Sequence, residues 1–559
     1  MDGVGEPYLS VVVTARNDDH GGNLLDRMQV FVAGWIEQAR RFHIPSELII
    51  VEWNPPPDRP RLIDALRWPV DLGCCEVRFI EVPPELHARY PHGGVLPLYQ
   101  MAAKNAGIRR ARGQFVLATN IDILFSDELA EYLAARRLER GRMYRIDRHD
   151  AMSDVPPDAP VEEQLAYCAT HLLRVNRREG SFNVSSEGHP ALSANDVAPD
   201  GSGISFGRGW YPPECHVPPD FFRWAGDVAE IHLEAPSEPG LALVLDIEPG
   251  PSTGGLPLQL EIDVDGEAAT RESLDCRKRL LVGFGSHYPQ RLLVRTPGGS
   301  VRINRDPRPL NLRVFRVAWE RQPKAQAVPA PTLETSLQAA PPAQHAVTLW
   351  HALMHLIDKL ANGGPLVQLT VPVSPRVRRL LKFYVDRGGL TGMLRHAPSA
   401  RRTDRDGPAE TASPSQPSAV AEASWQAPDF LHTNACGDFT LMAREHWFDL
   451  RGYPEMDLFS MNLDSLFCFA AHHGGAREEV LSEPMRIYHI EHGSGWTPEG
   501  QAKLFERVAA KGLSFIDNEG VLTMASQMRQ WGAPMIFNHE DWGLAAFVLN
   551  ETGVARRAS

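Results

Sequence analysis

Residues 104–122 read KNAGIRRARGQFVLATNID, and this stretch decides the fold expected of the chain. It predicts a helix, a turn at Gly113, a buried strand and a polar tip formed by Asn120 and Asp122. Ligands bind beyond the carboxyl ends of the strands in open α/β sheets. A carboxylate at this tip is therefore well placed to hold a divalent cation or a ligand hydroxyl.

Strand-like and helix-like segments alternate around this stretch. The run LSVVVTA at Leu9–Ala15 is rich in β-branched residues and typical of a strand buried on both faces. Ser126 is a plausible N-cap with acids in the following turn. The expected strands are 9–15, 47–52, 76–82 and 115–119, and the expected helices are 24–42, 99–112 and 127–140. This alternation predicts a mostly parallel, doubly wound sheet.

The pattern changes near residue 200. Short alternating segments separated by Gly- and Pro-rich turns predict an antiparallel β-sandwich inserted at 204–320, with strands at 229–233, 241–247, 258–264, 279–284, 291–295 and 312–319. Composition then predicts a linker at 321–345, a helical segment at 346–395 and a mobile loop at 396–428. Ordered character returns from residue 429, with strands expected at 438–442 and 484–490 and helices at 444–448 and 462–472.

The bulk properties narrow the class of protein. A length of 559 residues favours about two to four domains. The net charge of −13 disfavours nucleic acid and anionic membrane as partners. Seven cysteines without a C-x-x-C pair are expected to be reduced thiols, although an isolated disulfide stays open. With no signal-peptide pattern and no apolar run of about 20 residues, we expect a cytoplasmic protein, free or peripheral to a membrane.

Residues 104–122 resemble the central signature of the family 2 inverting glycosyltransferases of the GT-A fold. That signature is a basic-Asn-x-Gly helix, an Ala-x-Gly turn, an apolar strand and an acidic D-x-D tip. The resemblance covers roughly 8–148 and 430–495 and implies an α/β fold with a mixed, Rossmann-like GT-A sheet. It places a donor-binding half within 1–200 and an acceptor and catalytic half within 429–559. Asn120 stands where the family usually has Asp, so Asp122 is the main acidic residue of the tip.

The resemblance also implies a donor site. The donor would be a nucleotide-diphosphate sugar, with a UDP-sugar favoured, and the cofactor Mn²⁺ or Mg²⁺. Asp122 would hold the metal together with one histidine, since strand alternation puts His489 and His492 on opposite faces, and His489 is favoured. Arg148 is a candidate for the diphosphate. The remaining donor-binding candidates are Ala15, Arg16, Asn17, Glu52, Lys104, Asn105 and Asn120.

An inverting transfer needs a general base, which the family places at the start of a short helix after a Gly-aromatic-Pro/Asp-Glu turn. Here Gly452-Tyr453-Pro454-Glu455 precedes that helix, and Asp464 falls where the base belongs. Glu455 and Asp457 are reserve candidates for the base. Asp438 and Glu455 are candidates for binding the acceptor, a glycan or another hydroxyl compound.

Other interpretations stay open at this stage. A sugar nucleotidylyltransferase shares a related sheet, but Thr14-Ala15-Arg16-Asn17-Asp18 lacks the Gly-rich basic loop that such enzymes carry after the first strand. A non-catalytic glycan-binding protein with a degenerate transferase fold is the third hypothesis. Asp464 could serve only the dipole of its helix. The sandwich could hold an acceptor, mediate homo-oligomerisation or be a structural insert.

Overall fold

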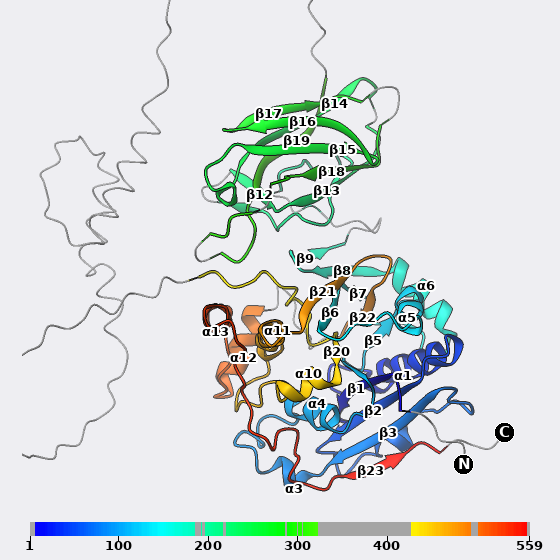
Figure 1. The fold of residues 1–559 in the computed structure, drawn as a ribbon. Coiled ribbons are helices and arrows are strands. Elements are labelled where there is room, and N and C mark those ends of the chain that lie inside the picture. The colour runs from blue at the N-terminus through cyan, green and yellow to red at the C-terminus, as the bar shows by residue number, and fades with distance from the viewer. Residues whose placement is uncertain are drawn as a thin grey trace, which may run out of the picture. The chain divides into compact units, whose positions relative to one another are not determined.

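The computed structural model describes residues 6–184, 192, 196–215, 220–236, 238–284, 288–298, 300–303, 306–321, 426–492 and 501–555 (Figure 1). Apart from their outermost residues, the expected linker at 321–345, helical segment at 346–395 and mobile loop at 396–428 lie outside the described residues. None of the helices in the described ranges is long and apolar enough to cross a membrane.

An eight-stranded mixed sheet runs through the α/β part in the order β21-β6-β20-β4-β1-β2-β3-β23 (Figure 1). The four middle strands are parallel: β4 (Phe115–Ala118), β1 (Leu9–Ala15), β2 (Ser46–Trp53) and β3 (Cys75–Val82). The flanking strands are β20 (Thr440–Ala443), β6 (Arg142–Ile146), β21 (Arg477–Leu481) and β23 (Asn550–Gly553). The parallel pairing expected for the strands of the first 140 residues is present in β4, β1, β2 and β3, and the antiparallel pairing of β20 and β23 makes the whole sheet mixed, as expected for the complete fold.

Helices cover both faces of this sheet because its middle strands are apolar on both sides. Val11 and Val13 of β1 belong to one core cluster, into which α1 (Leu24–Arg41) inserts Phe31 and Trp35. Val12 points to the opposite core. That second core is covered by α4 (Gln100–Arg109), α10 (Arg444–Asp449) and α11 (Leu463–His473). The other helices of the described residues are α2 (Leu62–Ala65), α3 (Pro84–His87), α5 (Asp127–Ala134), α6 (Val161–Thr170), α12 (Gln501–Ala510) and α13 (Asn518–Trp531).

A second sheet, in the order β5-β22-β7-β8-β9, matters for the site because its strands come from distant parts of the chain. The strand β22 (Ile487–Ile490) pairs with β5 (Ile123–Phe125) on one side and with β7 (Arg148–Ala151) on the other. The register sets His489 opposite both Ile123 and Asp150. The sheet is completed by β8 (Leu172–Arg177) and β9 (Gly180–Asn183).

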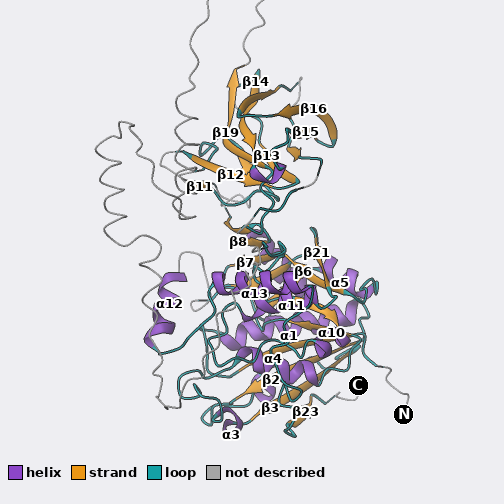
Figure 2. Ribbon diagram, turned by 60° about the vertical axis from the view of Figure 1, so that its left-hand side comes forward, coloured by secondary structure: helices purple, strands orange, loops and turns teal. Residues whose placement is uncertain are grey.

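Residues 204–321 contain the expected antiparallel strands, which Figure 2 shows joined by loops and one short helical turn, Pro251–Thr253. One five-stranded sheet has the order β10 (Ile204–Phe206), β13 (Val228–Leu233), β18 (Arg291–Arg295), β15 (Leu258–Val264), β16 (Glu267–Leu274). The other has the order β11 (Glu214–Cys215), β12 (Phe221–Ala225), β19 (Leu312–Arg321), β14 (Leu241–Pro249), β17 (Lys278–Val282). Both sheets contribute to one buried apolar cluster, which includes Ile231 and Leu260 from the first and Leu243 and Val314 from the second. The domain boundaries and the role of this part stay predictions.

The helix expected at 127–140 is shorter in the structure. Ser126 caps α5 as predicted, since its hydroxyl oxygen accepts a hydrogen bond from the Leu129 N–H. The helix ends at Ala134, and Arg136 adopts a left-handed φ of 52°. A residue in that conformation ends an α-helix, and apolar periodicity alone does not reveal it.

The turn between α4 and β4 depends on Gly113. Its N–H donates to the Ser10 hydroxyl oxygen at 2.8 Å, and that hydroxyl donates to Glu47 Oε1 at 2.6 Å. A Cβ at position 113 would lie 2.6 Å from the Ser10 backbone nitrogen. The backbone of the turn therefore approaches β1 more closely than any side chain allows.

Replacing Gly113 by Ala is expected to destabilise the protein by about 1–3 kcal/mol, because a clash with backbone cannot be relieved by side-chain rotation. Urea unfolding followed by tryptophan fluorescence measures the change. Gly94→Ala is the matched control, since a Cβ there meets nothing within 4 Å. It should stay within about 0.5 kcal/mol of the native protein. Equal unfolding midpoints for the two variants would contradict the packing argument.

Candidate functional site

A cavity of about 1410 Å³ opens at the carboxyl ends of β1 and β4. The parallel pairing of these strands brings their polar tips to one edge of the sheet. Segments from distant parts of the chain complete the wall, among them 95–101, 433–438, 459–465 and 504–519. The polar residues that line it include Arg16, Asp18, His20, Arg27, Gln100, Asn120, Asp122, Arg148, Asn434, Asp438, Asp464, His489, His492, Lys511 and Glu519.

Asp122 is almost fully buried in this wall, and its two carboxylate oxygens have different surroundings. Oδ2 accepts a hydrogen bond from Arg27 Nη1 at 2.8 Å. The same oxygen lies 3.4 Å from His492 Nε2 and 3.9 Å from His489 Nε2. Oδ1 is buried without a hydrogen-bond partner among the described residues. An unpaired buried carboxylate oxygen is costly, so a cation at this point would remove a penalty.

Both histidines lie beside Asp122, which differs from the expectation that strand alternation lets only one of them approach. The strand β22 ends at Ile490, so alternation does not extend to His492. Burial is the main cause that lowers the pKa of His492, to about 4. For His489, burial and the Arg148 charge are outweighed by Asp150 and Asp122, and its pKa is raised.

These three side chains fit the metal that the resemblance implies. One carboxylate oxygen and two imidazole nitrogens lie within 4.8 Å of one another. Mg²⁺ prefers oxygen ligands alone, whereas imidazole suits softer divalent ions. The donor set could therefore hold a divalent transition-metal ion and suits Mg²⁺ less well. The positive charge of the Arg27 guanidinium would repel the ion, but Arg27 hydrogen-bonds only Oδ2 of Asp122.

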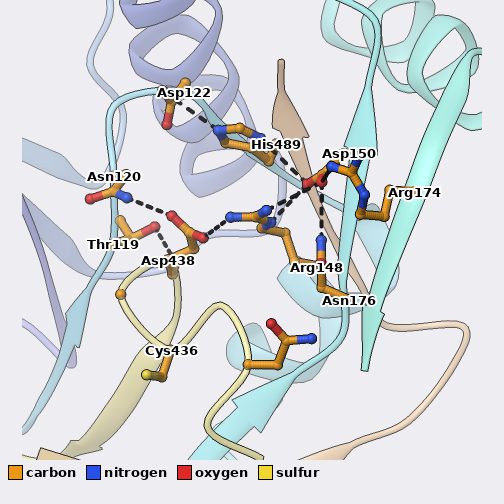
Figure 3. Close-up of polar contacts among 12 residues, drawn as sticks. Thr119, Asn120, Asp122, Arg148, Asp150, Arg174, Asn176, Cys436, Asp438 and His489 are labelled. Carbon is orange, nitrogen blue, oxygen red and sulfur yellow. Dashed lines mark hydrogen bonds and ion pairs between the residues drawn. The ribbon is translucent and has the colours of Figure 1, made fainter. Parts of the chain in front are cut away.

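Asp438 and Asp150 are tied together by one arginine (Figure 3). Arg148 donates to Asp438 Oδ2, and its Nε lies 2.8 Å from Asp150 Oδ1. Asp438 also accepts from the Asn120 amide, and its main-chain oxygen accepts from the Thr119 hydroxyl at 2.6 Å. Burial would raise the pKa of Asp438, but the Arg148 charge and its hydrogen bond lower it overall. Asp438 is therefore a charged side chain in the cavity wall that accepts hydrogen bonds. Its lowered pKa makes it a weak base.

Asp464 behaves in the opposite way. It lies in the first turn of α11 and lines the cavity. Burial raises the pKa of its carboxyl despite the nearby Lys104 charge. A Cβ on Gly437 would lie 2.8 Å from Asp464 Oδ2, so glycine at 437 leaves room for the carboxylate. A carboxylate with a raised pKa is a stronger base than ordinary Asp.

Of the four residues expected to bind the nucleoside, two line the cavity and two do not. Ala15 and Arg16 are part of the wall, and Arg16 Nε donates to the Asn54 carbonyl at 2.7 Å. Asn17 and Glu52 are buried beside it. The Asn17 amide donates to the Pro60 carbonyl at 2.8 Å.

The Glu52 oxygens accept from Arg61 Nε and from the Leu62 N–H, each at 3.0 Å. Burial raises the pKa of Glu52. Its carboxylate is thus occupied in holding the residues that follow β2.

Lys104, Asn105 and Glu455 lie behind the cavity wall. Lys104 is fully buried, and its ammonium donates to the Gly437 carbonyl at 2.7 Å. The Asn105 amide donates at 2.8 Å both to the Tyr453 carbonyl and to Glu455 Oε1. The Glu455 oxygen also accepts from the Gly543 N–H at 2.8 Å. These contacts make Asn105 and Glu455 braces between α4 and the 452–455 turn, and Asp457 is not part of the cavity wall either.

Sequence reasoning missed Arg27 and Asp150. Arg27 lies within the helical pattern of α1, where a charged residue is normally assigned to the solvent face, yet it is buried. Asp150 follows Arg148 at strand spacing, which places both on one face of β7. That i, i+2 spacing of opposite charges was the available signal. This spacing indicates a role near the site only when β22 is known to pair with β7.

Comparisons with known proteins add little to this geometry. No protein-family model and no curated protein matches the chain. Among solved structures, the chain is similar to the galactosyltransferase LgtC in complex with donor and acceptor sugar analogues, at 19% sequence identity and a TM-score of 0.16. The similarity covers 26% of this chain and 47% of LgtC, about half of that protein's length. A TM-score this low carries no argument about fold or activity.

Replacing Asp122 by Asn is expected to weaken Mn²⁺ binding at least about tenfold, or about 1.4 kcal/mol, because a charged ligand becomes a neutral amide of the same size. Electron paramagnetic resonance of free Mn²⁺ measures the dissociation constant. Asp18→Asn is the control, since Asp18 lines the same cavity but pairs with Arg16 at 2.7 Å. Unchanged Mn²⁺ affinity in Asp122→Asn would remove the metal assignment.

Proposed function

We propose that the protein is a metal-dependent glycosyltransferase with a GT-A fold that transfers a sugar from a nucleotide-diphosphate donor to a hydroxyl acceptor. The observation that carries the proposal is the set of residues that line one cavity. A potential metal group at a strand end and a carboxylate with a raised pKa line the same wall. The proposal rests on this cavity and on the resemblance of residues 104–122, not on the similarity to LgtC.

The donor would bind along the tips of β1 and β4. A bound Mn²⁺ would neutralise the charge that develops on the departing diphosphate. Asp122, His489 and His492 would hold that ion, and Arg148, which is part of the same cavity wall, would face the phosphates. We propose a UDP-sugar as the donor on the family resemblance, with Arg16 next to the nucleoside.

Asp464 would be the general base. Its carboxylate takes the proton of the acceptor hydroxyl while that oxygen bonds to the anomeric carbon. The bond from that carbon to the diphosphate oxygen breaks in the same step, and the nucleoside diphosphate leaves. Such a single displacement inverts the configuration at the anomeric carbon. Asp438, kept charged by Arg148, would accept a hydrogen bond from another acceptor hydroxyl.

A panel of nucleoside diphosphates and nucleotide sugars, with and without Mn²⁺, tests this proposal by thermal shift, because a ligand of the native state raises its apparent stability. Release of the nucleoside diphosphate then reports turnover, and NMR of the product gives its anomeric configuration. Pyrophosphate release from a nucleoside triphosphate would instead support a nucleotidylyltransferase. Binding without any turnover would support the non-catalytic alternative.

Replacing Asp464 by Asn is expected to lower kcat by about 10²–10⁴-fold, since a general base contributes that much. Donor and Mn²⁺ affinities should stay unchanged, because the metal group does not include Asp464. Glu519→Gln is the control, an exposed carboxylate of the same cavity. Full activity in Asp464→Asn would overturn the assignment of the base.

The pH dependence of kcat/KM gives a separate check. The base must be deprotonated, so activity is present above the pKa of Asp464 and lost as pH falls through it. Burial raises this pKa, so the acid limb should lie above the ordinary value for Asp, about 3.9. Stopped assays between about pH 3 and 8 with saturating Mn²⁺ locate the limb. An acid limb at or below the ordinary Asp value would contradict the raised pKa.

A further inference from the structure

His489 lies between two carboxylates that approach its ring from opposite sides (Figure 3). Its Nε2 faces Asp122 Oδ2 at 3.9 Å, and its Nδ1 faces Asp150 Oδ1 at 3.4 Å. Asp150 is fully buried, and it is the direct neighbour of His489 in the pairing of β22 with β7. The ring therefore has one nitrogen toward the proposed metal group and the other toward a fixed carboxylate.

Neither of the two atoms that face each other on the Asp150 side makes a hydrogen bond among the described residues. His489 Nδ1 and Asp150 Oδ1 are both buried, and the oxygen has an ion-pair contact with Arg148 Nε at 2.8 Å. The separation of Nδ1 and Oδ1 is slightly longer than the usual 2.7–3.2 Å of an N–H···O bond. A small approach of the ring would satisfy both atoms at once, which is the arrangement that a buried polar pair favours.

Asp150 is itself held in place. Its Oδ2 accepts from Asn176 Nδ2 at 3.1 Å and from Arg174 Nη1 at 3.3 Å. Arg148 contacts both of its oxygens, through Nε at 2.8 Å and Nη2 at 3.2 Å. Burial alone would raise the pKa of Asp150, but the Arg148 charge and the contact with His489 lower it well below its usual range. The carboxylate is thus a rigid, charged hydrogen-bond acceptor.

The same surroundings exclude a metal on this side of the ring. Asp150, His489 and Glu491 also bring ligand atoms within 4.8 Å of one another. Two guanidinium groups already contact Asp150, however, and Arg174 Nη1 lies 4.0 Å from Glu491 Oε2. A divalent ion there would face both positive charges at short range. Within the part of the chain that the structure describes, Asp122 has one arginine contact and an oxygen without a hydrogen bond, so it is the better metal side.

We propose that Asp150 is a positioning residue that fixes the proton of His489 on Nδ1 and so presents Nε2 to the metal. The inference rests on the proposed metal role of Asp122 and His489 and deepens it. A carboxylate that accepts from the second ring nitrogen fixes the tautomer and raises the basicity of a metal-binding histidine. The proposed hydrogen bond between Asp150 and His489 would form without the metal, from a contact that already brings the two atoms to 3.4 Å.

The first test uses Mn²⁺ affinity in full-length protein. Asp150→Asn should weaken Mn²⁺ binding by about 10–100-fold, the usual cost of losing such a partner. An Asn amide can donate to Nδ1, which moves the ring proton to Nε2 and blocks the metal side. Glu491→Gln is the matched control and should bind Mn²⁺ within about twofold of the native protein. Equal losses in both variants would place the metal between Asp150 and Glu491 and overturn the proposal.

The His489→Ala background separates positioning from general damage. Asp150→Asn should have no further effect on Mn²⁺ affinity there, because the residue through which Asp150 acts is gone. An equal loss in both backgrounds would show that Asp150 acts by another route and would overturn the proposal.

The second test needs no Asp150 variant and no metal. Nitrogen NMR of protein labelled with ¹⁵N-histidine, with the signals of His489 assigned by their absence in His489→Gln, reports which ring nitrogen carries a proton. A proton on Nδ1 at about pH 8.5, in the neutral ring or the cation, is expected. A proton on Nε2 alone would overturn the proposal. If the native protein binds no Mn²⁺, the proposed metal function fails, while this spectrum still decides the hydrogen bond to Asp150.

Discussion

The pairing of β20 with β4 is the interaction on which the site depends. It inserts a strand from near residue 440 between β4 and β6, which come from the first 150 residues. The backbone hydrogen bonds of this pairing set Asp438 beside Asn120 at the end of β4. Without it, the polar tip would face solvent. With it, carboxylates from both halves of the chain lie around one cavity.

Bringing these carboxylates together has an electrostatic cost that the fold meets with buried cations. Isolated buried charges are strongly unfavourable, and removing one partner leaves the other uncompensated. Arg27 pairs with Asp122, Arg148 pairs with both Asp438 and Asp150, and the Lys104 ammonium lies behind them. Burial lowers the pKa of Lys104 more than the nearby carboxylates raise it. Asp464 is the member that keeps a raised pKa.

The local parts of this arrangement were predictable and the long-range parts were not. The β-branched run at Leu9–Ala15 and the turn at Gly113 predict strands and their direction, because strand propensity and glycine packing are local properties. Asp122 and His489 were predicted from a resemblance, and the structure places them in one group. Asn105 and Glu455 match the family motif but are consumed by backbone contacts that only the folded chain reveals. Arg27 and Asp150 acquire their roles through partners about 95 and 340 residues away, which no periodicity encodes.

The position of His489 links the two halves of this electrostatic system. One ring nitrogen faces Asp122, whose second oxygen is unpaired, and the other faces Asp150, which is saturated with cations. Asp150 cannot attract a further positive ion, but it can still accept one N–H bond from a ring. The arginines therefore do more than neutralise buried charge. They make Asp150 unsuitable as a metal ligand and leave Asp122 available. The metal is therefore expected on the Asp122 side of the His489 ring.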